Sequence, residues 1–332
     1  MAQMKYFYEL TISSSPHAHS PVTTQTIMRD VLIALVPALL GSIYFFGFRA
    51  LLVTLVSAAA CVFFEWGFCK IRKLHCKTYD LSAVVTGVLL AFVCPVTIPY
   101  WTIILGDFFA IVLVKMLFGG LGKNIVNPAL AGRAFLFSWP VLMSNWVKVG
   151  FDNAAGLLST ADAVTAATPM SAMHQGALPE ESILDMFLGN IGGCIGETSA
   201  LLLIIGFIYL LYRKVITARI PLAYIGTVAI LAFLFPQGND RIAWMAAQVF
   251  GGGLMLGAIF MATDYVTSPL TKLGQIVYGI GCGVLTVIFR SAGLYPEGVT
   301  YAILLMNAAS WLLERFTPTR LFGAPQRKGG LR

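Results

Sequence analysis

The sequence predicts an all-α polytopic membrane protein of about ten transmembrane helices, arranged as two inverted five-helix repeats with Pro-broken helices. Two observations indicate the membrane: 58% of the 332 residues are hydrophobic, and only 11% are charged. Soluble domains carry about 25% charged residues. A third observation, the spacing of the apolar runs, indicates how many spans there are.

A transmembrane helix needs about 20 mostly apolar residues, and ten segments of this chain approach that length. They are 31–48, 50–69, 81–97, 100–118, 128–143, 194–212, 220–236, 243–262, 272–289 and 299–313. The third and fifth are short or interrupted, because Pro95 and Pro99 close one, while Pro128 and Pro140 bracket the other. Proline removes a backbone donor and ends or kinks a helix, so the freed backbone groups must be satisfied inside the protein.

These spans divide the chain into five parts. They are a cytoplasmic N-terminal segment (1–30), a first five-helix repeat (31–143), an outer loop (144–193), a second five-helix repeat (194–313) and a basic cytoplasmic tail (314–332). An odd number of spans in each repeat makes the second repeat inverted relative to the first. The run 87–99 also resembles the run 257–269, and inverted repeats of this kind place sites near the repeat interface.

The distribution of basic residues predicts the orientation. Of the 22 lysines and arginines, only Arg49, Lys148, Arg241 and Arg290 fall on the outer side when the N-terminus is placed in the cytoplasm. Arg133 lies within a span, and all the others fall on the inner side. This asymmetry follows the positive-inside rule. We therefore expect a multi-pass protein of the inner (cytoplasmic) cell membrane, with both termini cytoplasmic and the 144–193 loop facing outward.

Several kinds of site have no sequence signal here. The six cysteines are scattered without a C-x-x-C pattern, so no zinc or self-contained iron–sulfur site is indicated. No G-x-G-x-x-G fingerprint follows a strand, so no dinucleotide-binding site is indicated. The net charge of +7 reflects membrane topology, and we expect no nucleic-acid partner.

The outer loop is the only long segment outside the spans, and loops longer than about 12–15 residues are uncommon unless they are functional or disordered. It contains the run Asp162-Ala-Val-Thr165-Ala166-Ala-Thr168-Pro169. A residue before proline is biased toward an extended backbone, which would present the Thr168 hydroxyl away from any helix. Taken without other information, such a Thr/Ala-rich sequence is typical of a solvated loop.

Three other features agree with that run. They are His17, the run 122–133 (GKNIVNPALAGR) and the run 261–269 (MATDYVTSP). Together they resemble the RnfD/NqrB family of membrane flavoproteins, from about Met4 to Phe322. In that family, a flavin transferase joins the phosphate of FMN to the last threonine of a D-x-x-[S/T]-G-A-T motif.

The resemblance therefore implies an FMN phosphoester on Thr168, with Asp162 and Thr165 as motif residues and Ala166 in place of the usual glycine. It further implies a membrane electron-transfer subunit of an ion-translocating ferredoxin:NAD+ oxidoreductase complex, with little activity alone. Its partners would be the other subunits, including a second flavin subunit and ferredoxin- and NAD-handling subunits. The sequence leaves open whether Na+ or H+ is moved.

A second, non-covalent riboflavin is also implied, and two junctions on the expected cytoplasmic side offer groups for it. Asn124 and Asn127 open the fifth span, while Asp264, Thr267 and Ser268 link the eighth and ninth. These side chains can hydrogen-bond an isoalloxazine ring or a ribityl chain, although plain helix capping is the alternative. Because the hydrocarbon layer is about 30 Å thick, electrons crossing it between an outer FMN and a cytoplasmic donor need an intermediate stop.

Ionisable residues inside spans are costly, at ~2.5–3.5 kcal/mol on insertion scales, and mark pathways or internal pairs. Asp107 in the fourth span is the first candidate for ion coordination or proton carriage, and a structural pair with Arg133 is the alternative. Glu65 is the second candidate, with snorkelling toward Lys70 or Arg72 as its alternative. For the whole chain, the rival functions are a secondary transporter or channel with an inverted-repeat fold and a purely structural scaffold.

Overall fold

The computed structural model describes residues 22–73, 78–143, 146, 168–174, 176–179, 181–197, 199–238, 240–292 and 298–318. All regular secondary structure in these ranges is helical. Three helices there, Thr24–Phe46, Phe48–Ile71 and Lys272–Ala292, are long and apolar enough to cross a membrane. The count rises to four if the bent pair Arg241–Phe250 and Leu254–Met261 is taken as one span. The chain is therefore a helical membrane protein.

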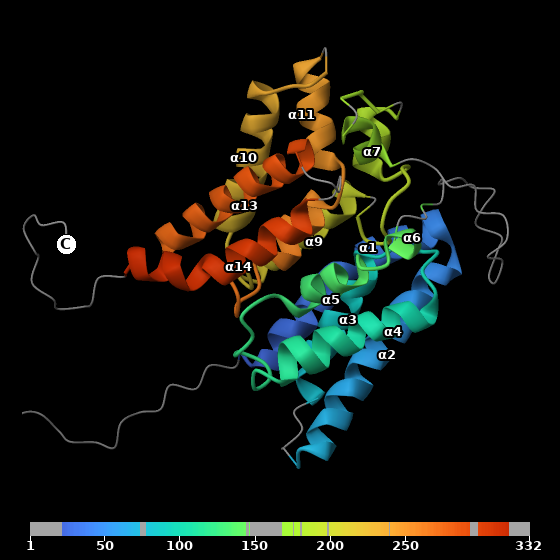
Figure 1. The fold of residues 1–332 in the computed structure, drawn as a ribbon, viewed down its shortest axis with the longest axis vertical. Helices are drawn as coiled ribbons and strands as arrows, with labels where there is room; N and C mark the ends of the chain where they lie inside the picture. Colours follow the sequence, from blue (N-terminus) through green and yellow to red (C-terminus); the bar gives the residue numbers. More distant parts are fainter. Residues whose placement is uncertain are drawn as a thin grey trace, which may run out of the picture.

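The first half of the chain forms the helices drawn in blue to green in Figure 1. They are α1 (Thr24–Phe46), α2 (Phe48–Ile71), the 3-10 turn η2 (Thr78–Asp80), α3 (Ser82–Phe92), α4 (Tyr100–Phe108), its π-helical continuation η3 (Phe109–Met116), α5 (Pro128–Leu136) and α6 (Pro140–Met143). Local signals begin several of them. The Thr23 hydroxyl caps α1 by accepting the N–H of Thr26, and the Asn127 side chain caps α5, whose first residue is Pro128.

The second half forms the helices drawn in yellow-green to red. They are α7 (Pro169–His174), α8 (Ile183–Leu188), α9 (Ala200–Tyr212), α10 (Arg219–Leu234), α11 (Arg241–Phe250), α12 (Leu254–Leu256) with its π-helical continuation η5 (Gly257–Met261), α13 (Lys272–Ala292) and α14 (Val299–Phe316). Each of the predicted spans contains a helix. The third and fifth are indeed short, because α3 has 11 residues and α5 has 9.

The eighth predicted span, 243–262, is not one continuous helix. It breaks between α11 and α12, and the two parts are bent by 57°. Gly252 and Gly253 at the break have φ angles of 64° and 67°, in the left-handed region that favours glycine. A Cβ atom on Gly253 would also collide with the Glu197 carboxylate. Two adjacent glycines therefore end the helix where the hydrophobic pattern alone continues it.

Backbone carbonyls freed at the interruptions are satisfied by arginines. The buried Arg290 guanidinium donates to the carbonyls of Gln248, Gly251 and Gly252 at the α11–α12 break. The half-buried Arg49 guanidinium donates to the carbonyls that follow α3, including that of Val96 at 2.8 Å. The expectation that Pro-broken spans are satisfied inside the protein is confirmed at the segment after α3.

The two halves meet along several helix pairs. Helix α1 packs against α9, and α5 packs against α14. The buried Asp30 near the start of α1 accepts hydrogen bonds from Tyr209 and Arg213 at the end of α9. Gly41, farther along α1, lies against Leu202 near the start of α9. The two helices are therefore antiparallel, and the start of α9 lies at the end of the molecule opposite the start of α1.

Candidate functional site

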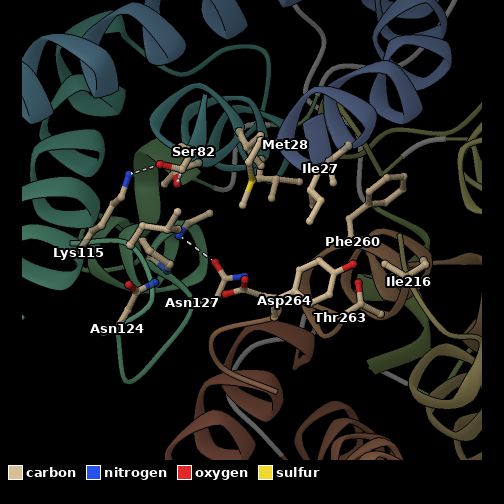
Figure 2. A pocket seen from close by; sticks show the side chains of 18 of the residues that line it. Ile27, Met28, Ser82, Lys115, Asn124, Asn127, Ile216, Phe260, Thr263 and Asp264 are labelled. Atoms are coloured by element: carbon tan, nitrogen blue, oxygen red, sulfur yellow. Dashed lines mark hydrogen bonds between the residues drawn. The ribbon is translucent and has the colours of Figure 1, made fainter. Parts of the chain in front are cut away.

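Three of the five predicted riboflavin residues, Asn124, Asn127 and Asp264, meet at a pocket between the two halves, which we call the central pocket (Figure 2). Its walls come from α1, α3, η3, the segment before α5, the end of α9 and the link from η5 to α13. It is lined by Ile27, Met28, Val31, Ser82, Val85, Thr86, Leu89, Lys115, Leu121, Asn124, Asn127, Pro128, Ala129, Leu210, Ile216, Phe260, Thr263, Asp264 and Tyr265. The cavity volume is about 80 Å³, enough for a few water molecules.

Asn124 and Asn127 differ in how much of their hydrogen-bonding capacity is already used. The side-chain oxygen of Asn127, Oδ1, accepts the backbone N–H groups of Ala129 and Leu130. Its side-chain amide nitrogen, Nδ2, donates to the backbone carbonyl of Met261 at 3.3 Å. The buried Asn124 Oδ1 has no hydrogen-bond partner among the described residues. The capping alternative therefore describes Asn127, whereas Asn124 keeps an acceptor for whatever occupies the pocket.

The link from η5 to α13 brings Asp264 to the same pocket. Its carboxylate accepts the backbone N–H of Val266 at 3.4 Å and the Thr267 hydroxyl at 3.2 Å. Desolvation between the packed segments raises the pKa of Asp264, and these hydrogen bonds oppose the rise. Thr267 and Ser268 lie outside the lining, and the Ser268 N–H bonds the Asp264 carbonyl. Their contact is with Asp264 rather than with the pocket.

The chemistry of this lining suits a flavin ring. Asn124 supplies an acceptor for a ring N–H, Phe260 and Tyr265 supply aromatic surface, and aliphatic side chains of α1 and α3 complete the walls. Binding sites for small molecules typically combine such apolar walls with a few convergent polar groups. Because the cavity volume is only about 80 Å³, the lining side chains must move apart for a ring system to enter.

Glu65 is a buried residue, and its environment corrects the snorkelling alternative. Its carboxylate pairs with the Lys115 ammonium at 2.9 Å, and side-chain exposure is 7% for Glu65 and 1% for Lys115. Lys70 instead lies over the Trp66 ring. Lys115 of the π-helical η3 places its ammonium against the inner face of α2, and Glu65 pairs with it there. Beside this pair lies a second pocket, the vestibule, of about 720 Å³.

The vestibule opens at the end of the bundle where α1 begins and α2 ends. Its lining comes from Thr23, Thr24, Gln25, Glu65, Cys69, Tyr79, Asp80, Met116, Gly119, Gly120 and Leu121. The Asp80 carboxylate accepts the Ser82 hydroxyl at 2.6 Å, and that hydroxyl in turn accepts from Lys115 at 2.7 Å. A chain of polar contacts thus leads from the vestibule to Lys115.

Asp107 is fully buried, and its contacts differ from the expected pair with Arg133. One carboxylate oxygen accepts the Ser57 hydroxyl at 2.7 Å and the Cys61 thiol at 3.2 Å. Its other oxygen has no hydrogen-bond partner among the described residues. Cys61 lies one helical turn before Glu65 on α2, so both acidic residues face the seam between α2 and the α4–η3 helix.

Arg133 pairs with a residue that the sequence pattern did not single out. Its guanidinium donates to Glu197 at 3.0 Å, to the Thr300 hydroxyl at 3.3 Å and to the Cys194 sulfur at 3.3 Å. These partners belong to the second half of the chain, so the pair joins the two halves. Glu197 sits in the short coil before α9, where no periodic pattern indicates burial. Glu197 is the only charged residue of the predicted span 194–212, and this is the signal that the sequence offers.

Thr168 lies just before α7 and is 5% exposed. Its hydroxyl oxygen accepts the N–H of Ser171 at 3.3 Å, so the side chain caps α7. The expectation that this hydroxyl points away from any helix is therefore wrong. Thr168 lines a small cavity of about 20 Å³ with Glu197 and Gly252. This cavity cannot enclose a flavin ring, so an attached group would extend beyond it. Asp162 and Thr165 lie outside the described residues.

The two candidate sites lie at opposite ends of α9. Glu197, just before this helix, lines the cavity at Thr168, whereas Leu210 near its end lines the central pocket. With a rise of 1.5 Å per residue, the ten steps of α9 from Ala200 to Leu210 span roughly 15 Å. The fold therefore separates the predicted covalent site from the predicted non-covalent site by about half of the ~30 Å hydrocarbon thickness.

The fold and these sites define a polytopic membrane protein with two buried polar centres at opposite ends of its helices. The profile of the NQR2, RnfD, RnfE family matches residues 11–323, and the chain belongs to this family.

Named relatives cover nearly the whole chain, and each is the subunit designated D of its own complex. One belongs to the Na(+)-translocating ferredoxin:NAD(+) oxidoreductase complex of Acetobacterium woodii and is 47% identical over 96% of this chain and 97% of that protein. Another belongs to the proton-translocating ferredoxin:NAD(+) oxidoreductase complex of Clostridium ljungdahlii and is 43% identical over 94% of this chain and 96% of that protein. A third belongs to the ion-translocating oxidoreductase complex of Halorhodospira halophila and is 35% identical over 93% of this chain and 94% of that protein.

Proposed function

We propose that this chain is the membrane electron-transfer subunit of an ion-translocating ferredoxin:NAD+ oxidoreductase complex, carrying FMN on Thr168 and riboflavin in the central pocket. The observation that carries this proposal is the placement of the two sites at opposite ends of α9. Bound flavins exchange one or two electrons, which matches one-electron iron–sulfur donors to the two-electron acceptor NAD+. The polypeptide holds the two groups apart and sets their surroundings.

Contacts of α7 hold the backbone at Thr168 in place. His174 at the end of α7 contacts the Arg290 carbonyl through Nδ1 at 3.0 Å, so α7 is fixed against α13. The Thr168 hydroxyl acts as an acceptor toward Ser171. An ester oxygen retains that acceptor role, so esterification is compatible with the cap. A flavin transferase partner is required to form the bond.

The ion path that we propose follows the seam between α2 and the α4–η3 helix. Asp107 and Glu65 each have a buried carboxylate oxygen without a hydrogen-bond partner among the described residues. Such an oxygen is an acceptor for a cation or a proton. The vestibule beside Glu65 offers access from one end of the bundle. Under the positive-inside rule this end faces the cytoplasm, and the Thr168 end faces outward.

Helix packing supports the proposed two inverted five-helix repeats. In the first half α2 packs on α3 and α4, and in the second half α10 packs on α11 and α13. The similar runs 87–99 and 257–269 both cover the end of a helix and the link to the next. Arg49 donates a hydrogen bond to the Val96 carbonyl in the link within the run 87–99. Arg290 donates to the Gly252 carbonyl at the break that precedes the run 257–269.

The test of the covalent site is in-gel ultraviolet fluorescence of the denatured chain, co-expressed with the flavin transferase. We expect a fluorescent band from the wild-type chain and its complete loss in Thr168→Val, which keeps the shape of the side chain but removes the hydroxyl. Ser171→Ala, which keeps Thr168, serves as the control and should stay fluorescent. A wild-type chain without a band would contradict the proposal.

Electron transfer by the assembled complex separates this function from the scaffold alternative. A scaffold predicts that Thr168→Val leaves ferredoxin-dependent NAD+ reduction intact. An electron-transfer role predicts that the reduction is lost while the complex still assembles. A transporter or channel predicts ion flux that needs no electron donor.

A further inference from the structure

Lys115 lies between the central pocket and the vestibule. Its side chain lines the central pocket, while its partner Glu65 lines the vestibule. Figure 2 shows the Lys115 ammonium directed at Ser82 on the wall of the pocket. Leu121 is shared by both linings, so the two spaces are close neighbours. Lys115 therefore borders the central pocket directly and is linked to the vestibule through Glu65.

The donors of Lys115 are only partly used. An ammonium has three N–H donors; one reaches Glu65 at 2.9 Å and another reaches Ser82 at 2.7 Å. The hydrogen bonds among the described residues leave the third donor unassigned, and the Lys115 side chain lines the central pocket. On the other side, Glu65 Oε2 has no hydrogen-bond partner among the described residues. Lys115 is a point charge on a flexible four-carbon stem, so it can change partners without a change in backbone.

We propose that Lys115 couples the charge of the group in the central pocket to cation binding at Glu65. This inference rests on the proposed riboflavin in that pocket. Riboflavin bound there would supply one-electron chemistry, with reduced ferredoxin as the electron donor. A negative charge gained in the pocket would draw the Lys115 ammonium away from Glu65, and Glu65 would then take up one monovalent cation, Na+ or H+, from the vestibule. One negative charge and one positive charge would have entered, so the buried region would keep its net charge.

The physical reason for coupling is the high cost of an unpaired buried charge. With Lys115 paired to Glu65, a negative charge in the pocket is poorly compensated. With a cation on Glu65, Lys115 can compensate the pocket instead. Cation binding and electron uptake therefore favour each other, and this coupling is reciprocal.

The experiment is a spectroelectrochemical titration of the non-covalent flavin in the purified complex. In the wild type we expect the midpoint potential to rise as the cation that binds Glu65 becomes more abundant. Lys115→Met should shift the potential in the negative direction, and Glu65→Gln should shift it in the positive direction. Both variants should lose the cation dependence. Lys123→Met, which removes an exposed lysine nearby, should resemble the wild type.

Two arms distinguish the cations. A series of Na+ concentrations at fixed pH tests Na+, and a pH series without Na+ tests whether the pH slope of the wild type exceeds that of Glu65→Gln. Shifts of the same sign in the two variants, or a cation dependence that survives in Lys115→Met, would overturn the coupling. If Lys115→Met does not assemble, the positive shift in Glu65→Gln remains a sufficient test, and its absence overturns the proposal.

Flavin content, measured first, separates this inference from the proposed function. A wild-type complex without non-covalent flavin would contradict the second cofactor and, with it, the coupling. A complex that holds the flavin but shows no opposed shifts would contradict the coupling alone.

Discussion

Asn124 lines the central pocket with a buried amide oxygen that no described residue satisfies. Buried acceptors are normally paired, and an unpaired one costs about 1–3 kcal/mol. Its neighbours Asn127 and Asp264 already accept backbone or hydroxyl donors. At the scale of single residues, Asn124 is therefore the side chain whose bonding depends most on an occupant.

We predict that Asn124→Ala lowers the riboflavin affinity of the purified protein by about 5- to 100-fold, the equivalent of one lost hydrogen bond in a buried site. The measurement is riboflavin recovered per mole of protein after dialysis, with the covalent band on Thr168 as the internal reference. Ser268→Ala, outside the lining, should retain the wild-type content. Equal riboflavin content in Asn124→Ala and the wild type would remove Asn124 from the site.

At the scale of elements, the break between α11 and α12 depends on Arg290. Its guanidinium satisfies three carbonyls that the interrupted helix leaves exposed inside the protein. Arg49 has a similar role after α3, but it is only half-buried, so water can replace part of its bonding. A broken span is stable only when such groups are satisfied within the protein.

We predict that Arg290→Met lowers stability strongly, because each buried carbonyl left unpaired costs about 1–3 kcal/mol. The measurement is the thermal unfolding midpoint of the purified protein in detergent. Arg49→Met should give a smaller loss, and Arg241→Met, which removes an exposed arginine at the start of α11, should give little or none. Equal midpoints for Arg290→Met and Arg241→Met would refute the role of Arg290 at the break.

At the scale of the whole molecule, Arg133 and Glu197 join the two halves through a buried ion pair. Arg133 is 2% exposed and also bonds Thr300 on α14. Removing one partner of such a pair leaves a buried charge without compensation. Replacing both partners with apolar side chains is often far less damaging.

We predict that Arg133→Met alone costs about 3–5 kcal/mol, and that the double variant Arg133→Met with Glu197→Met recovers much of this loss. Unfolding midpoints of the single and double variants supply the comparison. Arg213→Met, which breaks a pair whose arginine side chain is 46% exposed, should cost much less because solvent screens it. Additive losses at Arg133 and Glu197 would show that the two side chains act independently.

Several features of this protein were readable in the sequence. Hydrophobic runs indicated the helices, because a span must satisfy its backbone internally. The prolines at 95, 99 and 128 predicted the short α3 and α5. The resemblance to membrane flavoproteins rested on short runs, two of which contribute residues to the central pocket. The assignments of Thr168 and of the riboflavin residues to cofactors remain predictions.

Composition and local chemistry along the chain thus determined the membrane helices, the interruptions at prolines and the candidate site residues. Only the tertiary structure decided which buried charges meet. It paired Glu65 with Lys115 and Arg133 with Glu197, where the sequence suggested snorkelling and an Asp107–Arg133 pair. The physical reason is that a buried ion pair depends on the approach of residues 50 and 64 positions apart, and local periodicity carries no information about such distances.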